Sequence, residues 1–172
     1  FLDGSTLGSE SELTTSEVVA VMTDGAEAIR NVGLYNASHG NITPDNVWIV
    51  EQDDGPLGIV GDWGLRRAVA EAQGETHVTP YTAPEQLARG PSTTNDTTDV
   101  YGLGAVTYEG LTGEPPLPAS EEEILAGEVP PPSEVSETPE AFDEPVMRAI
   151  ATDPDERFDS AYDFASALKD RL

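Results

Sequence analysis

The chain has 172 residues, of which 33 are acidic and 8 are basic, and its formal net charge is -25. This length predicts one domain that buries a sizeable core. The acidic excess argues against a face that binds nucleic acid or anionic lipid, because little positive charge is present to neutralise phosphates. The absence of cysteine excludes disulfides and thiolate metal sites.

The acidic residues are spread along the whole chain, which argues against a disordered acidic tail. Self-repulsion on this scale destabilises a compact state in dilute buffer, and salt screens it. We therefore expect a domain adapted to molar salt, as in proteins of halophilic archaea, in preference to an acidic interaction surface. No apolar run approaches a membrane span and no signal peptide opens the chain, so we expect a cytoplasmic location without membrane insertion of this segment.

A long helix is predicted in the first part of the chain. Residues 1–7 form an apolar and turn segment too short to make a strand layer by itself. The pattern Thr14-x-x-Glu17 predicts a capping box, and apolar residues at helical spacing follow it as far as Gly33, a residue suited to helix termination. This largely buried helix delivers the chain to the segment that begins at His39.

A small antiparallel hairpin is predicted next. Residues 47–50 and 57–60 are candidate strands, and the acidic residues 51–56 join them. The joining segment lacks the ligand spacing of a calcium loop, so we interpret it as a solvated hairpin turn. Residues 65–98 look irregular and polar, and a connection of this length inside a compact domain usually has a function.

The rest of the chain predicts further helices. From Asp99 the chain turns apolar at roughly helical spacing, with Thr107 on the buried face, where its hydroxyl needs a partner. A short helix at residues 120–126 lies within a Pro-rich stretch, another helix begins near Thr138, and Ser160 caps the last one. The result is a mainly α fold of about five to six helices with one small β-hairpin.

Several short motifs occur in one order along the chain. They are the loop from His39 to Asn46, Asp62-Trp63-Gly64, Ala83-Pro84-Glu85, the apolar helix from Asp99, and the turn at residues 153–158. As a series they resemble the C-terminal lobe of eukaryotic-type (Hanks-type) Ser/Thr protein kinases. The resemblance covers residues 1–172 from hinge to last helix, and nothing before Phe1 matches the small N-terminal lobe.

The resemblance implies a role for two metal-holding positions. Asn46 and Asp62 stand where the family holds Mg²⁺ on the phosphates of ATP, and an amide oxygen and a carboxylate suit that hard cation. This cofactor site also needs an N-lobe. The alternative interpretation is that both side chains now only hydrogen-bond the loop.

The resemblance also implies structural roles. His39 would pack under the catalytic loop, and Asp99 would accept hydrogen bonds from the loop's backbone. Glu85 would pair with Arg157 in a buried ion pair that locks the lobe and is costly to break from one side.

The departures from the family pattern all affect chemistry. Asn41 replaces the Asp that accepts the substrate proton, and a neutral amide cannot take that proton. Thr43 replaces a Lys that contacts the transferred phosphate, which removes a cation from a site that works by electrostatic stabilisation. Gly40 replaces the Arg that grips a phosphorylated activation loop, so we do not expect that switch. Residues 77–80 do not reproduce the family's Gly-Thr substrate loop.

These features leave three hypotheses. The first is a catalytically impaired pseudokinase that acts in signalling through protein contacts. The second is an active or weakly active ATP-dependent Ser/Thr kinase with a protein substrate, whose N-lobe lies outside this sequence. The third is a small-molecule phosphotransferase, suggested by His39-Gly40, but residues 83–85 and the helix from Asp99 are typical of protein kinases.

Overall fold

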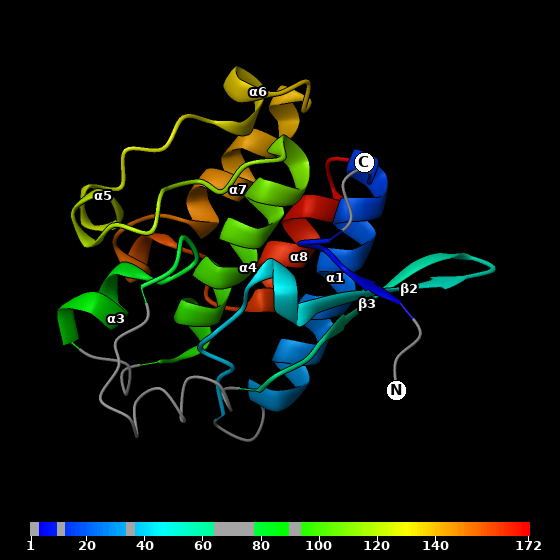
Figure 1. Cartoon of the computed structure of the whole chain (residues 1–172), viewed down its shortest axis with the longest axis horizontal. Helices are drawn as coiled ribbons and strands as arrows, with labels where there is room; N and C mark the ends of the chain where they lie inside the picture. The colour runs from blue at the N-terminus through cyan, green and yellow to red at the C-terminus, as the bar shows by residue number, and fades with distance from the viewer. Residues whose placement is uncertain (1–3, 10–12, 34–36, 64–77, 90–93) are drawn as a thin grey trace.

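The computed structural model describes residues 4–9, 13–33, 37–63, 78–89 and 94–172 (Figure 1). Parts of the expected motifs lie outside these described residues. They are residues 1–3 of the expected hinge, Gly64 of the Asp-Trp-Gly motif, His77, and half of the long polar connection at residues 65–98.

Helix α1, Thr15–Gly33, begins at the predicted capping box. The Thr14 amide N–H and the Thr14 hydroxyl both donate to Glu17 Oε2, at 2.8 and 2.6 Å. These bonds hold the pKa of the Glu17 carboxyl below its usual range. Behind the cap, α1 buries an apolar face whose Val and Ile side chains each stabilise the fold by about 1.5–3 kcal/mol relative to exposure.

A three-stranded antiparallel sheet packs against α1, where a hairpin alone is predicted. Strands β2, Val47–Gln52, and β3, Gly55–Val60, form the hairpin with a shorter turn than expected. Strand β1, Ser5–Thr6, adds to the open edge of β2, so a segment that is too short to make a strand layer by itself still contributes a strand. A two-residue strand has no alternation to recognise, because it exists only through its pairing with β2.

Gly58 sets how closely the sheet approaches α1. A Cβ atom at this position would lie 2.1 Å from the Val21 carbonyl oxygen, so a side chain does not fit there. The close contact lets Val47, Ile49 and Val60 join the core beneath α1.

Helix α4, Asp96–Thr112, runs through the centre of the molecule, with α1, α7 and α8 packed around it (Figure 1). A capping box between Asn95 and Thr98 starts it, and Gly113 in the left-handed region ends it. The Thr107 hydroxyl donates to the Leu103 carbonyl oxygen at 2.7 Å, which satisfies this buried polar group.

Five shorter helices complete the described helical part of the molecule. They are α3 Pro84–Arg89, α5 Glu121–Ala126, α6 Pro132–Val135, α7 Asp143–Ala149 and α8 Ala161–Lys169. Three of them, α6, α7 and α8, pack against α4. The mainly helical prediction is confirmed, but the described part of the chain has seven α-helices instead of five to six. The unpredicted α3 and α6 both begin at a proline and are too short for a helical period.

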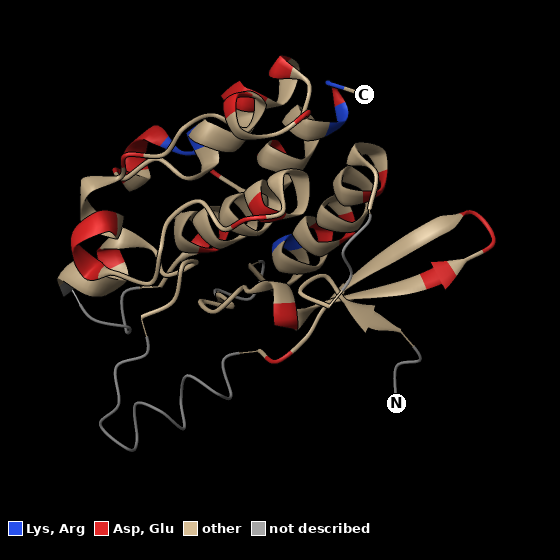
Figure 2. Ribbon diagram, turned by 45° about the horizontal axis from the view of Figure 1, so that its top comes forward, with Lys and Arg blue, Asp and Glu red and all other residues tan. Residues whose placement is uncertain are grey.

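The charge of the chain is distributed over its surface. The ribbon in Figure 2 is coloured red for Asp and Glu at the hairpin turn and on most helices, with few blue Lys or Arg positions among them. Among the described helices, none has the length and apolar character needed to cross a membrane.

Candidate active site

The loop that carries the predicted site lies between α1 and β2 and is anchored to α4. The amide N–H groups of His39 and Gly40 donate to the two carboxylate oxygens of Asp99, at 2.7 and 2.6 Å. Asp99 is 1% exposed and lies in the first turn of α4. Bonds to a buried carboxylate are stronger than neutral ones, so they hold the start of the loop firmly on the central helix.

His39 ties the same loop to the end of β3. Its side chain is 1% exposed, its Nε2 lies 2.9 Å from the Gly61 carbonyl oxygen, and its ring packs on Trp63 with centroids 4.8 Å apart. The Asn41 amide N–H donates to His39 Nδ1 at 3.3 Å. Both contacts are satisfied by the neutral imidazole with its proton on Nε2. The histidine thus orders the backbone on either side of the site.

A second helix, α3, reaches the loop through Gln86. Its Nε2 donates to the Gly40 carbonyl oxygen at 3.0 Å, and its Oε1 accepts from the Ala83 amide N–H at 2.9 Å. Gly40 has a φ of 66°, a left-handed conformation that glycine adopts without strain. Sequence reasoning missed Gln86, although a Gln three residues after a helix N-cap is a capping pattern.

The two degenerate positions lie on the turn that leads into β2. Asn41 and Thr43 are both half-buried. The Asn41 carbonyl oxygen accepts from Asn46 Nδ2 at 2.9 Å, and the Thr43 carbonyl oxygen accepts from the Asn46 amide N–H at 2.9 Å. Their side chains are neutral, so these two positions offer hydrogen bonds but neither a base nor a cation.

Asn46 and Asp62, the predicted metal-holding residues, lie at the facing ends of β2 and β3. The Gly61 amide N–H, next to Asp62, donates to the Asn46 carbonyl oxygen at 2.8 Å. Asn46 uses its Nδ2 on the loop, and its Oδ1 is the side-chain atom suited to a cation. Asp62 has a φ of 54°, an unusual conformation outside glycine that is found at functional sites.

Asn46 and Asp62 offer an amide oxygen and a carboxylate, the types of ligand that Mg²⁺ prefers. Mg²⁺ prefers oxygen and binds through one or two carboxylates completed by water and substrate phosphates. Within the described residues, no group of three or more His, Asp or Glu side chains is placed to hold a metal ion.

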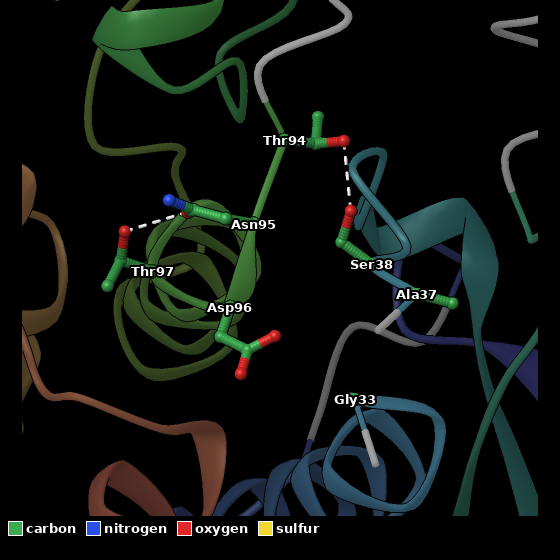
Figure 3. Close-up of a pocket in the computed structure, with 7 residues that line it drawn as sticks. All are labelled: Gly33, Ala37, Ser38, Thr94, Asn95, Asp96 and Thr97. Carbon is green, nitrogen blue, oxygen red and sulfur yellow. Dashed lines mark hydrogen bonds between the residues drawn. The ribbon is translucent and has the colours of Figure 1, made fainter. Parts of the chain in front are cut away.

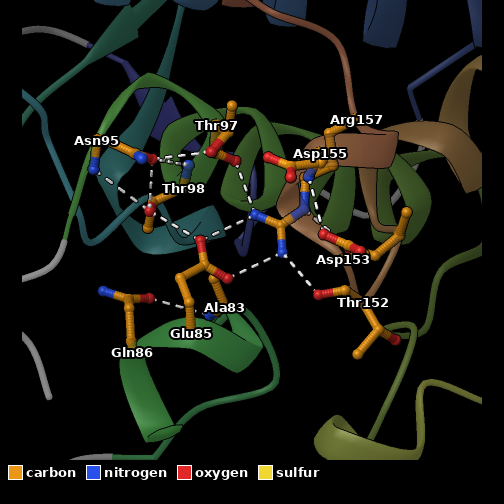
Figure 4. A network of polar contacts seen from close by, with 11 residues as sticks. Ala83, Glu85, Gln86, Asn95, Thr97, Thr98, Thr152, Asp153, Asp155 and Arg157 are labelled. Carbon is orange, nitrogen blue, oxygen red and sulfur yellow. Dashed lines mark hydrogen bonds and ion pairs between the residues drawn. The ribbon is translucent and has the colours of Figure 1, made fainter. Parts of the chain in front are cut away.

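Glu85 of α3 and Arg157 form a buried ion pair below the loop (Figure 4). Arg157 Nη1 and Nη2 each donate to one Glu85 oxygen at 2.9 Å, and the Thr98 hydroxyl donates to Glu85 Oε1 at 2.8 Å. Burial raises the pKa of Glu85, but the hydrogen bonds and charge of Arg157 outweigh it, so the net pKa is lowered. The sequence analysis did not include Thr98 in this cluster.

Arg157 also joins segments that are far apart in the chain. It donates to the carbonyl oxygens of Ala151 and Thr97, each at 2.8 Å, and its guanidinium lies 4.9 Å from the centre of the Tyr101 ring. Burial raises the pKa of the Tyr101 phenol to about 12. The cluster therefore connects α3, α4 and the turn before α8.

Tyr81 makes a further contact with α4 that sequence reasoning missed. Its hydroxyl donates to the Glu109 carboxylate. Burial raises the pKa of the Tyr81 phenol most, and the bond to Glu109 raises it further. Just before it, the Thr79 amide N–H donates to the Thr82 hydroxyl at 2.9 Å and closes a tight turn. Residues 78–82 are thus held against the central helix.

Two cavities lie beside the described part of the site. One, of about 350 Å³, lies between the end of α1 and the start of α4, where Ser38 donates to Thr94 at 2.9 Å (Figure 3). The other, of about 460 Å³, lies between α3, α5 and the turn at residues 152–156. Asn41, Asn46 and Asp62 line neither of them.

Comparison with known proteins gives a consistent result. The model of the protein kinase domain family matches residues 5–167. Serine/threonine-protein kinase Pkn1 of Myxococcus xanthus is 32% identical over 98% of this chain and 26% of its own length. Serine/threonine-protein kinase PknB of Mycolicibacterium smegmatis is 28% identical over 98% of this chain and 29% of its own length.

A solved structure agrees with the sequence relatives. The kinase domain of Mycobacterium tuberculosis PknI superposes with a TM-score of 0.77 at 25% identity, covering 99% of this chain and 63% of that chain. The chain therefore spans less than two thirds of this solved kinase domain, and a smaller share of the curated relatives that it matches.

Proposed function

Because this chain belongs to the protein kinase domain family, we propose that it is the C-terminal lobe of a catalytically impaired Ser/Thr kinase. In this proposal the domain acts in signalling through contacts with a protein partner. The observation that carries it is Asn41: a neutral amide occupies the proton-accepting position on a loop whose backbone contacts are otherwise made.

The contrast between frame and chemistry supports this proposal. Asp99 holds the backbone of the loop and Arg157 holds Glu85, each through short charge-assisted bonds. The side chains that act on the phosphate and the hydroxyl are the ones replaced, at Asn41 and Thr43. Loss of reactive groups on an intact frame is expected of a domain kept for binding.

Mg²⁺ and ATP are part of the proposal when the lobe is joined to an N-lobe. Asn46 Oδ1 and the Asp62 carboxylate would hold the metal, which neutralises the phosphate charge when it is bound. Asn41 would hydrogen-bond an incoming hydroxyl without removing its proton. Thr43 would offer a hydroxyl where a cation otherwise attracts the phosphate.

The acidic composition supports a proposed setting for the domain. We propose a cytosol of high salt, where the repulsion within a chain of net charge -25 is screened. The same charge argues for a protein partner and against nucleic acid.

A weakly active Ser/Thr kinase is the second candidate. The oxygen ligands of Asn46 and Asp62 favour it, because phosphoryl transfer depends mostly on positioning and charge stabilisation. A kinase of this kind tolerates loss of the base better than loss of its metal.

The test is transfer of labelled γ-phosphate by the longest natural form of the protein, in molar KCl with Mg²⁺ and Mn²⁺. The pseudokinase proposal expects no transfer above the level of an Asp62→Ala variant. Transfer by the natural protein that disappears in Asp62→Ala would instead establish the second candidate.

A further inference from the structure

We infer that Gln86 is a positioning residue that couples helix α3 to the catalytic loop by holding the peptide group between Gly40 and Asn41. The coupling itself depends only on the contacts of these residues. Its consequence for phosphoryl transfer rests on the proposed function, because Asn41 occupies the position of the catalytic base.

The Gln86 side chain forms a bridge between two segments 46 residues apart in sequence. Its Oε1 accepts from the Ala83 amide N–H at 2.9 Å, and the Gln86 amide N–H donates to the Ala83 carbonyl oxygen at 2.9 Å. This reciprocal pair caps α3 and fixes the side-chain amide in place. Its Nε2 is then directed at the Gly40 carbonyl oxygen, 3.0 Å away.

The Gly40–Asn41 peptide is held at both of its polar groups. Its carbonyl oxygen accepts from Gln86, and its N–H donates to His39 Nδ1 at 3.3 Å. Because a peptide group is planar, these two contacts set its orientation and so the direction of the Asn41 N–Cα bond, about which the Asn41 side chain is placed.

Gly40 makes this restraint necessary. The Asp99 carboxylate holds the Gly40 N–H at 2.6 Å, on the far side of the glycine from the peptide in question. Glycine has no Cβ to limit rotation, so sterics alone do not define the next peptide plane. Gln86 restrains this plane at its carbonyl oxygen, and His39 restrains it at its N–H.

The position of Gln86 links this restraint to the buried ion pair. Its neighbour Glu85 fixes α3 to Arg157 through two bonds of 2.9 Å. A shift of α3 would therefore move the group that holds the Gly40 carbonyl oxygen. In this way the position of α3 controls the geometry at position 41.

Gln86→Glu isolates the bridge. The carboxylate keeps an oxygen acceptor for the Ala83 amide N–H, so the cap of α3 is retained, but it has no N–H to donate to Gly40. Gln52→Glu is the matched control, because it makes the same change of charge at an exposed position at the end of β2. Gln86→Met removes both halves of the bridge.

The first measurement is NMR of the loop in molar KCl, independent of any activity. In Gln86→Glu we expect the Gly40 carbonyl ¹³C resonance to move upfield and the Asn41 amide to exchange about fivefold faster, the effect of losing one net hydrogen bond. Gln86→Met should show the same change, and Gln52→Glu should show neither. An unchanged Gly40 resonance and Asn41 exchange rate in Gln86→Glu would overturn the inference.

The second measurement adds Gln86→Glu to an Asn41→Asp, Thr43→Lys variant of the longest natural form. The inference expects a lower kcat with an unchanged KM for ATP, because the base is misdirected while nucleotide contacts remain. Equal kcat with and without Gln86→Glu would contradict the functional coupling. Altered loop resonances together with no transfer by any variant would leave the coupling in place and refute the proposed catalytic frame.

Discussion

Replacement of Arg157 by alanine tests the buried ion pair that fixes α3 to the rest of the lobe. The Arg157 and Glu85 side chains are 0% and 9% exposed, so the variant leaves a carboxylate without its cation in a site that water barely reaches. It also removes the donors to the carbonyl oxygens of Ala151 and Thr97 and the cation above the Tyr101 ring.

The size of the effect follows from these contacts. Breaking a buried ion pair from one side costs about 3–5 kcal/mol, much of it for the uncompensated charge. The contact with the Tyr101 ring adds about 1 kcal/mol. We therefore expect Arg157→Ala to lower the free energy of unfolding by about 4–6 kcal/mol, a large share of the roughly 5–15 kcal/mol typical of a domain.

The assay is urea unfolding in molar KCl, with Arg171→Ala as the control. Arg171 pairs with Glu144 at 3.1 Å, but their side chains are 39% and 60% exposed, so this variant should cost less than about 1 kcal/mol. If both variants lost the same small amount of stability, the reasoning about burial would be refuted. A double variant, Glu85→Gln with Arg157→Met, should be more stable than Arg157→Ala, because no buried charge is left unpaired.

Three further predictions concern pH, packing and salt. Because folding lowers the pKa of Glu85, the stability that Glu85 contributes is complete above its unfolded pKa and is lost as the pH falls through its folded pKa. The free energy of unfolding of the natural protein should therefore fall on acidification below the usual Glu range, and it should fall less in Arg157→Ala. No fall, or an equal fall in both proteins, would contradict this. Gly58→Ala should lower the free energy of unfolding by about 3 kcal/mol, because its Cβ would meet the Val21 carbonyl oxygen. Gly33→Ala is the control and should be tolerated, because the atom nearest to its Cβ would be 3.4 Å away. Equal effects of the two variants on urea unfolding would count against this packing argument. In dilute buffer the chain should lose its helical circular dichroism and regain it in molar KCl; cooperative melting without salt would disprove the salt dependence.

The sequence predicted the helices that are marked by local patterns of neighbouring residues. Helices α1 and α8 begin at the capping patterns of Thr14 and Ser160, and α4 follows the apolar spacing from Asp99. Caps and periodicity are properties of neighbouring residues, so a single chain displays them. Strand β1 and helices α3 and α6 were not predicted, because each is too short for a period and depends on the element it packs against.

The residues of the candidate site that lie within short sequence motifs could be predicted from the sequence. Asn41, Asn46 and Asp62 stand out by pattern, and their roles remain proposals. Gln86 and the Tyr81–Glu109 contact do not stand out, because an ordinary Gln or Tyr gains its meaning only from a partner distant in sequence. Such tertiary pairings follow from the fold and cannot be read from composition or spacing.

The most direct test of the central claim is restoration of phosphoryl transfer. Asn41→Asp with Thr43→Lys would be made in the longest natural form and assayed with labelled ATP and Mg²⁺ in molar KCl, beside the natural protein. A catalytically impaired kinase on an intact frame predicts no transfer by the natural protein and measurable transfer by the double variant, which Asp62→Ala then removes. Transfer by the natural protein at the level of the double variant would contradict the account.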